Sequence, residues 1–149
     1  MNPQNGYDIE EIAVGMTAEI AKTITDADIV LFAGVSTDMN AVHLDEEFGK
    51  TTAFGGRIAH GMLSASLLSA VLGNRLPGPG TIYMSQSLRF RAPVRPGDTV
   101  HARVTVKEVN AEKCRAVLDT VCTVGGKAVI DGEAMVMVTS RRKREAAGT

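Results

Sequence analysis

The feature that most constrains this sequence is a long stretch without a charged side chain. The range Ile58–Asn74 contains no Asp, Glu, Lys or Arg, and its apolar residues fall on every side of a helix drawn through it. A membrane-spanning helix needs about 20 predominantly apolar residues, whereas this stretch is shorter and includes His60 and Ser64. We therefore expect a helix surrounded by the rest of a folded domain, ended by Gly73 and Pro77.

The second half of the chain has the pattern of β-strands. Apolar and polar residues alternate over 100–107 and more briefly over 88–91, with Pro96-Gly97 as the turn between these two segments. Segments 115–123 and 127–139 flank Gly125-Gly126, which predicts a β-hairpin. Successive strands joined by short turns indicate an antiparallel sheet. One long buried helix against such a sheet gives an α+β domain, with the sheet curved around the helix.

The first half is more mixed. A strand is expected within 11–24, and Thr25 followed by Asp28 has the spacing of a capping box, which predicts a helix that Gly34 ends. Turn-forming residues make 35–43 a predicted loop, a short helix is expected over 45–50, and 51–57 is a second loop. No linker divides the chain, so we expect a single domain over 1–140 and a basic, flexible tail over 141–149.

Composition excludes several classes of protein. The 149 residues carry a net charge of -1 and only 4% are aromatic, which argues against a nucleic-acid partner. The cysteines, Cys114 and Cys122, cannot form a disulfide framework, and the first residues lack a signal peptide's basic and apolar segments. A cytoplasmic location without a membrane partner is therefore expected.

Candidate chemistry begins in the segment STDMNAVHLD. It places the carboxylate of Asp38 and the imidazole of His43 five positions apart in a predicted loop, where the two can converge on one small cavity and act as an acid/base pair. The alternative is that Asp38 and Asn40 are turn-forming residues and that His43 is a partly buried neighbour. Spacing alone leaves both interpretations open.

A second candidate is the dipeptide His60-Gly61 at the start of the charge-free helix. Backbone N–H groups at a helix N-terminus lack partners within the helix and lie at the positive end of its dipole. They can hold an oxyanion or a polarised carbonyl oxygen, and a glycine lets that oxygen approach the backbone. A glycine needed only for close packing is the alternative.

Other chemistries find little support. No G-x-S-x-G motif surrounds the serines of the charge-free helix, so a serine nucleophile is not expected. Metal-ligand motifs and a phosphate-binding loop are absent, and His43 and His60 are far apart in sequence, so no metal is expected. His101 falls on the polar face of an alternating strand and is expected to be a solvated surface residue.

The two candidate segments together resemble a known family. The run DMNAVHLDEEFGKTTAFGGRIAHGMLSASLLSAVLG is similar to the hydratase region of the MaoC-like, R-specific enoyl-CoA hydratases, in particular to short bacterial members. The similarity continues through GPGTIYMSQSLRFRAPVRPGD and more weakly to about Ser140. It implies a hot-dog fold, in which an antiparallel sheet wraps around a long helix. It also implies a homodimer and an acyl-CoA thioester as substrate, without a cofactor.

The resemblance assigns roles to individual residues. It implies that Asp38 and His43 form the catalytic pair, that Asn40 is a polar residue beside them, and that the Gly61 N–H binds the thioester oxygen. Ser69 matches a serine that supports the catalytic aspartate. His60, which precedes Gly61, is expected to have a supporting role at the site. Ala41 departs from the family pattern, because many members have proline there, and this could loosen the loop between Asp38 and His43.

The expected reaction is the reversible syn hydration of a trans-2-enoyl-CoA to an (R)-3-hydroxyacyl-CoA. Related hot-dog proteins include acyl-CoA thioesterases and non-catalytic acyl-CoA-binding modules, and Asp38 with His43 in one loop favours a hydratase over both. Dehydration of 3-hydroxyacyl groups on acyl-carrier protein stays open as a nearer alternative. Which of the two side chains activates water is not decided by the sequence.

Overall fold

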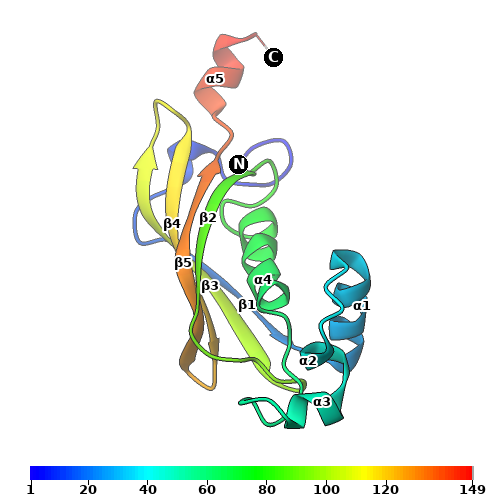
Figure 1. Ribbon diagram of the computed structural model, residues 1–149. Helices are drawn as coiled ribbons and strands as arrows, with labels where there is room; N and C mark the ends of the chain where they lie inside the picture. Colours follow the sequence, from blue (N-terminus) through cyan, green and yellow to red (C-terminus); the bar gives the residue numbers. More distant parts are fainter. Residues whose placement is uncertain (149) are drawn as a thin grey trace.

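A five-stranded antiparallel sheet packs against one helix, α4 (Gly61–Asn74), in the computed structural model, which describes residues 1–148 (Figure 1). The strands are β1 (Thr17–Thr23), β2 (Ile82–Phe90), β3 (Thr99–Asn110), β4 (Arg115–Val124) and β5 (Lys127–Met137). Their order in the sheet is β1-β3-β4-β5-β2. The expected α+β architecture is confirmed.

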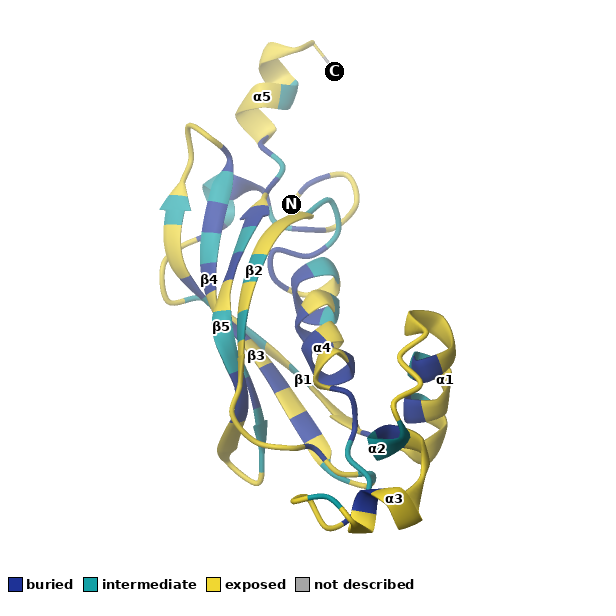
Figure 2. Ribbon diagram, viewed as in Figure 1, coloured by how far each residue is buried: buried dark blue, intermediate teal, exposed yellow. Residues whose placement is uncertain are grey.

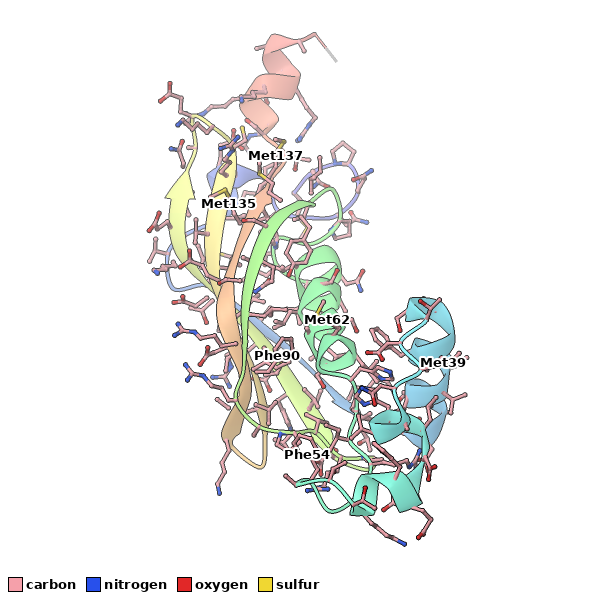
Figure 3. All side chains as sticks on the ribbon, in the orientation of Figure 1. Met39, Phe54, Met62, Phe90, Met135 and Met137 are labelled. Carbon is pink, nitrogen blue, oxygen red and sulfur yellow. The ribbon has the colours of Figure 1, made fainter. Side chains whose placement is uncertain are left out.

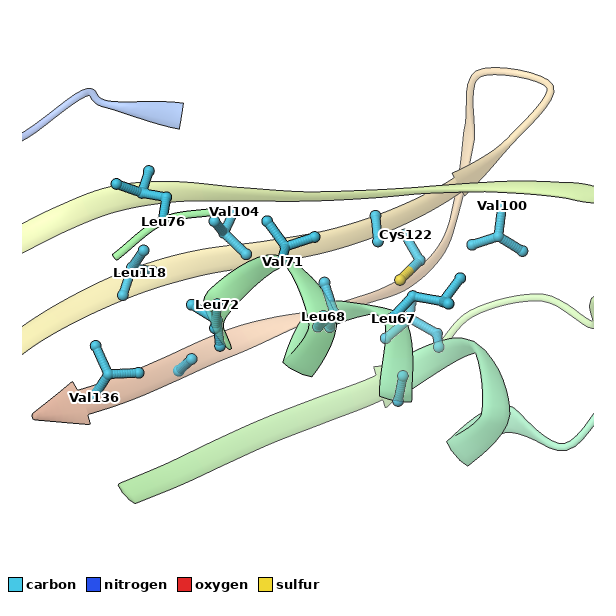
Figure 4. Packing of buried hydrophobic residues seen from close by; sticks show 14 of the residues in the cluster. Leu67, Leu68, Val71, Leu72, Leu76, Val100, Val104, Leu118, Cys122 and Val136 are labelled. Carbon is cyan, nitrogen blue, oxygen red and sulfur yellow. The ribbon is translucent and has the colours of Figure 1, made fainter. Parts of the chain in front are cut away.

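The core lies between α4 and the concave side of the sheet. Leu68 and Val71 of α4 are fully buried, and they face alternate residues of the strands such as Val104 and Leu118 (Figure 4). The intervening residues of β3, among them His101, are exposed or half-buried, as the alternating pattern predicted. This single apolar interface fixes the position of α4 and therefore of the residues at its N-terminal end.

The connection between β2 and β3 differs from the prediction. Pro96-Gly97 does form a turn, in which the Asp98 N–H donates to the Arg95 carbonyl at 3.0 Å, but β2 does not pair with β3. Instead β2 is an edge strand beside β5, and Leu88 lies opposite Gly132. A Cβ at Gly132 would lie 1.8 Å from the backbone oxygen of Ser87, so this pairing depends on glycine.

One face of α4 is open, contrary to the expectation of a helix surrounded on all sides. The residues toward the sheet are buried, whereas Met62, Ser66 and Ser69 are exposed (Figure 2). Met62 alone is 56% exposed, an unusual position for a large apolar side chain. No helix within residues 1–148 is long and apolar enough to cross a membrane.

Three α-helices precede α4 and lie near its N-terminal end (Figure 1). The first, α1 (Asp26–Ser36), begins with the predicted capping box between Thr25 and Asp28, but it continues past Gly34 to a left-handed residue, Thr37, at φ 65°. The next two are α2 (Ala41–Leu44) and α3 (Glu46–Lys50). The predicted loop over 35–43 therefore holds a helical turn, because the Asn40 side chain caps α2 by accepting from the Val42 N–H at 3.2 Å.

Segments near the two ends of the described residues are hydrogen-bonded to each other. A flexible tail was expected over 141–149, of which residue 149 lies outside the described residues. Two short helices, η1 (Ile9–Glu11) and α5 (Arg141–Ala146), lie close together, and Ser140 caps α5. The Arg144 guanidinium donates hydrogen bonds of 2.7 and 2.8 Å to the two oxygens of Asp8, whose residue is 1% exposed. A paired buried carboxylate gives the basic segment a fixed contact that its composition did not indicate.

This pair predicts a pH-dependent contribution to stability. Hydrogen bonding from Arg144 holds the pKa of Asp8 below its ordinary value of 3.8. The stabilisation is therefore complete above that value and is lost as the pH falls through the lowered pKa. We expect Asp8→Asn to lower the free energy of unfolding by about 1–3 kcal/mol at pH 7, and the difference from wild type to narrow below about pH 4 in urea titrations. A difference that is equal at pH 7 and pH 3 would contradict this account.

Candidate active site

Asp38 and His43 come together at one end of the α4 helix. Asp38 lies in the turn after α1, and His43 is in α2. The Oδ2 of Asp38 is 3.9 Å from the Nε2 of His43, with the Asp38 side chain 51% exposed and the His43 side chain 11% exposed. This distance is too long for a direct hydrogen bond, but a water about 2.8 Å from each atom can bridge them. The two side chains that were expected to converge do so.

One hydrogen bond of the His43 ring determines which nitrogen carries the proton when the ring is neutral. Its Nδ1 lies 2.8 Å from the carbonyl oxygen of Ile58. Because a carbonyl oxygen only accepts, Nδ1 carries the proton, and the lone pair of Nε2 faces Asp38. The pair thus presents a carboxylate oxygen and an imidazole nitrogen that can each take up or return a proton.

His60 lies directly against this pair. Its ring stacks on the His43 ring with centroids 3.8 Å apart and planes inclined by 28°. Its Nε2 lies 2.9 Å from the backbone oxygen of Asp38. The residue is 2% exposed. The two histidines are far apart in sequence, but the segment that leads into α4 brings them into contact.

Gly61 is the first residue of α4 and lines an apolar cavity of about 390 Å³. Within residues 1–148, the Gly61 N–H donates no hydrogen bond. The ring of Phe90 is packed against it, and a Cβ on Gly61 would lie 2.5 Å from the Phe90 Cε1 atom. Phe54 and Phe90 lie at this end of α4, on the side away from Met39 and α1 (Figure 3). The glycine therefore has both properties that were considered for it, a free amide and a close contact.

The remaining predicted residues have different settings. Asn40 caps α2 through its side-chain oxygen, so the turn-forming interpretation holds for it. Ala41 is the first residue of α2, a position that proline also favours, and the cap supplied by Asn40 keeps that turn formed without it. Ser69 lines a separate groove with Phe32, and no hydrogen bond joins Ser69 to Asp38 within the described residues.

The cluster also has the composition of a metal-ligand set. Asp38, His43 and His60 each place a ligand atom within 4.8 Å of the others. The lone pairs of the two stacked rings, however, lie in separate planes that are inclined by only 28°, with ring centroids 3.8 Å apart. A metal needs them to meet at one point about 2.0–2.1 Å from each nitrogen. Moreover, His43 Nδ1 and His60 Nε2 already face carbonyl oxygens. The geometry is suited to proton transfer rather than to metal binding.

A cysteine nucleophile is also disfavoured. Cys122 lies in the core on β4, and burial raises the pKa of its thiol to about 12. The thiol is therefore protonated near neutral pH and is not nucleophilic. Sequence reasoning missed two contacts at the site, the stacking of His43 on His60 and the packing of Phe90 on Gly61, because each joins segments that are distant in the chain.

Comparison with known proteins identifies the class to which this fold and site belong. Residues 10–130 match the family described as MaoC like domain. The chain belongs to this family.

Individual relatives align over nearly the whole chain. It is 58% identical over 132 residues to an (R)-specific enoyl-CoA hydratase of Rhodospirillum rubrum, covering 89% of this chain and 92% of that protein. It is 49% identical over 136 residues to a 3-hydroxybutyryl-CoA dehydratase of Methylorubrum extorquens, covering 91% and 87%.

Solved structures give the same result. The R-hydratase PhaJ1 of Pseudomonas aeruginosa superimposes with a TM-score of 0.86 at 44% identity, over 91% of this chain and 88% of that chain. An (R)-hydratase of Aeromonas caviae gives a TM-score of 0.84 at 44% identity, over 87% and 98%. The expected hot-dog fold is thereby confirmed.

Proposed function

We propose that this protein catalyses the reversible syn hydration of trans-2-enoyl-CoA to (R)-3-hydroxyacyl-CoA, with Asp38 and His43 as its acid/base pair. It is an enzyme of the hydratase class, as its relatives at 45–58% identity are. The observation that carries the residue assignment is the 3.9 Å approach of Asp38 Oδ2 to His43 Nε2. The two groups are close enough to share one water and too far apart to satisfy each other.

The reaction adds the two parts of water across a double bond. A water held between Asp38 and His43 loses a proton to the pair, and its oxygen bonds to C3 of the enoyl group. The pair returns one proton to C2, so the proton count of the enzyme is unchanged after each turnover. Because both groups come from one short segment, they reach the same face of the double bond, and the addition is syn.

The backbone amide of Gly61 would stabilise the charge that develops on the substrate. As water attacks C3, negative charge develops on the thioester oxygen. A backbone N–H at the N-terminus of α4 can donate to that oxygen, aided by the helix dipole. The free Gly61 N–H beside an apolar cavity supports this role. The apolar lining suits a hydrocarbon part of the substrate.

Asn40 remains a polar residue beside the site, and support of Asp38 by Ser69 remains a prediction from the resemblance.

We expect the active unit to be a homodimer. The edge strand β2 exposes Ile82, Tyr83 and Met84, at 59%, 38% and 40%. The open face of α4 adds Met62, so apolar side chains of two adjacent elements lack cover. An exposed apolar edge strand favours pairing with another chain. Light scattering at assay concentration should give twice the protomer mass, and a fully active monomer would refute this expectation.

The function is tested by assaying two activities on one substrate. With crotonyl-CoA, a hydratase removes the enoyl absorbance without releasing thiol, whereas a thioesterase releases free CoA. We expect the first result only. Thiol release at a comparable rate would favour the thioesterase alternative. Equal turnover of crotonyl groups on acyl-carrier protein would favour the dehydratase alternative.

A cytoplasmic location and independence from metal and cofactor remain predictions. Activity that persists after exhaustive chelation would support the latter.

A further inference from the structure

The position of Asp38 depends on few contacts outside its own loop. Its N–H donates to Ser36 Oγ at 3.1 Å, and its Oδ1 accepts from the Asn40 N–H at 3.2 Å, so both bonds are local. The His60 ring donates a hydrogen bond to the Asp38 backbone oxygen. Within residues 1–148, no other residue outside 36–43 is hydrogen-bonded to residues 37–40. The Asp38 side chain is half exposed, so packing does little to fix it.

His43 depends on the same neighbour in a different way. The bond to Ile58 fixes one nitrogen of its ring, but a single hydrogen bond allows the ring to tilt about that contact. The His60 ring covers one face of the His43 ring at 3.8 Å and limits that tilt. One side chain thus restrains the backbone of the first member of the pair and the ring of the second.

His60 itself is held rigidly. It is 2% exposed and is the N-cap residue of α4. Besides the His43 ring, it contacts the Phe32 ring, with ring centroids 4.9 Å apart. The residue that follows it is Gly61, whose amide is the proposed donor to the thioester oxygen. The acid/base pair and the amide are therefore connected through a single residue.

The hydrogen bonding of His60 has a cost to stability. Because the Asp38 carbonyl accepts, Nε2 must carry the proton, and Nδ1 is left as an acceptor. That Nδ1 is buried without a hydrogen-bond partner in the described structure. An unpaired buried acceptor destabilises a fold, and such groups are expected mainly where function requires them.

We propose that His60 is a positioning residue that holds Asp38 and His43 at a fixed distance from the Gly61 amide. The inference rests on the proposed function for its catalytic consequence. In hydration the attacking water must reach C3 while the Gly61 amide binds the oxygen on C1 of the same substrate molecule. A displacement of either the acid/base pair or the amide therefore lowers the rate. His60 sets that register without contacting the substrate.

Two variants separate the two contacts of His60. In His60→Gln the side-chain amide reaches the position of Nε2 and can donate to Asp38, but the ring is lost. In His60→Phe the ring remains and the donor is lost. We expect each to lower kcat by roughly tenfold or more with KM changed less than about threefold, and His60→Ala to lower kcat by roughly 100-fold. His101→Gln, a change at an exposed histidine on the outer face of the sheet, should have no effect.

Nitrogen-15 NMR of the free enzyme provides a readout that a merely structural role would not move. In the wild type, His60 should show a protected Nε2–H, and His43 a single Nδ1–H tautomer. In His60→Gln the His43 signals should broaden or show both tautomers, and in His60→Phe amide exchange at Asp38 should accelerate.

These spectra need neither substrate nor turnover, so they remain decisive even if the wild type does not hydrate enoyl-CoA. Variants that melt at lower temperature yet keep kcat per folded molecule and an unchanged His43 tautomer would overturn the proposal. A wild-type His60 protonated at Nδ1 instead of Nε2 would overturn it without any variant.

Discussion

Asp38→Asn and His43→Gln should each lower kcat for crotonyl-CoA hydration by about 10²–10⁴. Each change removes the ability to exchange a proton and leaves a side chain of similar size. Asp38 is half exposed, so its replacement should leave stability nearly unchanged. In His43→Gln the side-chain amide falls near the position of Nε2, so the Nδ1 bond to the Ile58 carbonyl is lost. His43→Asn, whose amide replaces Nδ1, is the matched variant that can keep this bond. Stopped assays with matched protein concentrations and circular dichroism spectra give the comparison.

The appropriate control is His101→Gln, which alters a histidine that pairs with Glu19 on the exposed face of the sheet. It should turn over like the wild type. If a folded Asp38→Asn or His43→Gln protein also kept near-wild-type turnover, the assignment of that residue to the acid/base pair would be wrong.

Gly61→Ala should lower kcat/KM by about 10². The new Cβ would lie 2.5 Å from the Phe90 ring, so either the ring or the first turn of α4 must move. Phe90 is 54% exposed and can rotate, but it also lines the cavity beside the Gly61 amide. The variant keeps the N–H donor and changes its surroundings, which tests the geometry of the site rather than its composition.

Two further variants isolate the cause. Gly73→Ala lies in the same helix, and a Cβ there meets nothing within 4 Å, so activity should be unchanged and stability slightly increased. Phe90→Ala combined with Gly61→Ala should recover part of the lost activity, because the contact that displaces the backbone is gone. Equal activities of the single and double variants would show that the Phe90 contact is not the cause.

Much of the fold could be predicted because it follows from residue patterns within short segments of the chain. The alternating residues of β3, the Gly125-Gly126 hairpin and the Thr25 capping box are all properties of short segments. The position of β2 is not. Its pairing with β5 depends on the absence of a side chain at Gly132, and a turn such as Pro96-Gly97 specifies a change of direction but no partner strand. The pairing of Asp8 with Arg144 is similarly non-local.

The site divides in the same way. The spacing of Asp38 and His43 allowed them to converge but left the turn-forming alternative open; the structure brings them to 3.9 Å because the helical turn α2 shortens the chain between them. The stacking of His43 on His60 could not, since it depends on how the segment before α4 returns to α2. The exposed face of α4 also differs from the prediction, because apolar and small residues on every side of a helix do not show which side the rest of the chain covers.

The most direct test of the whole account is the stereochemistry of hydration in deuterated water. In the proposed mechanism the Asp38–His43 pair reaches one face of the enoyl group, and the Gly61 amide fixes which face is presented. Crotonyl-CoA should therefore give (R)-3-hydroxybutyryl-CoA, which only an R-specific dehydrogenase oxidises, with the deuteron at C2 syn to the new hydroxyl. An S product, a racemic product or anti addition would contradict the proposed arrangement of these three groups.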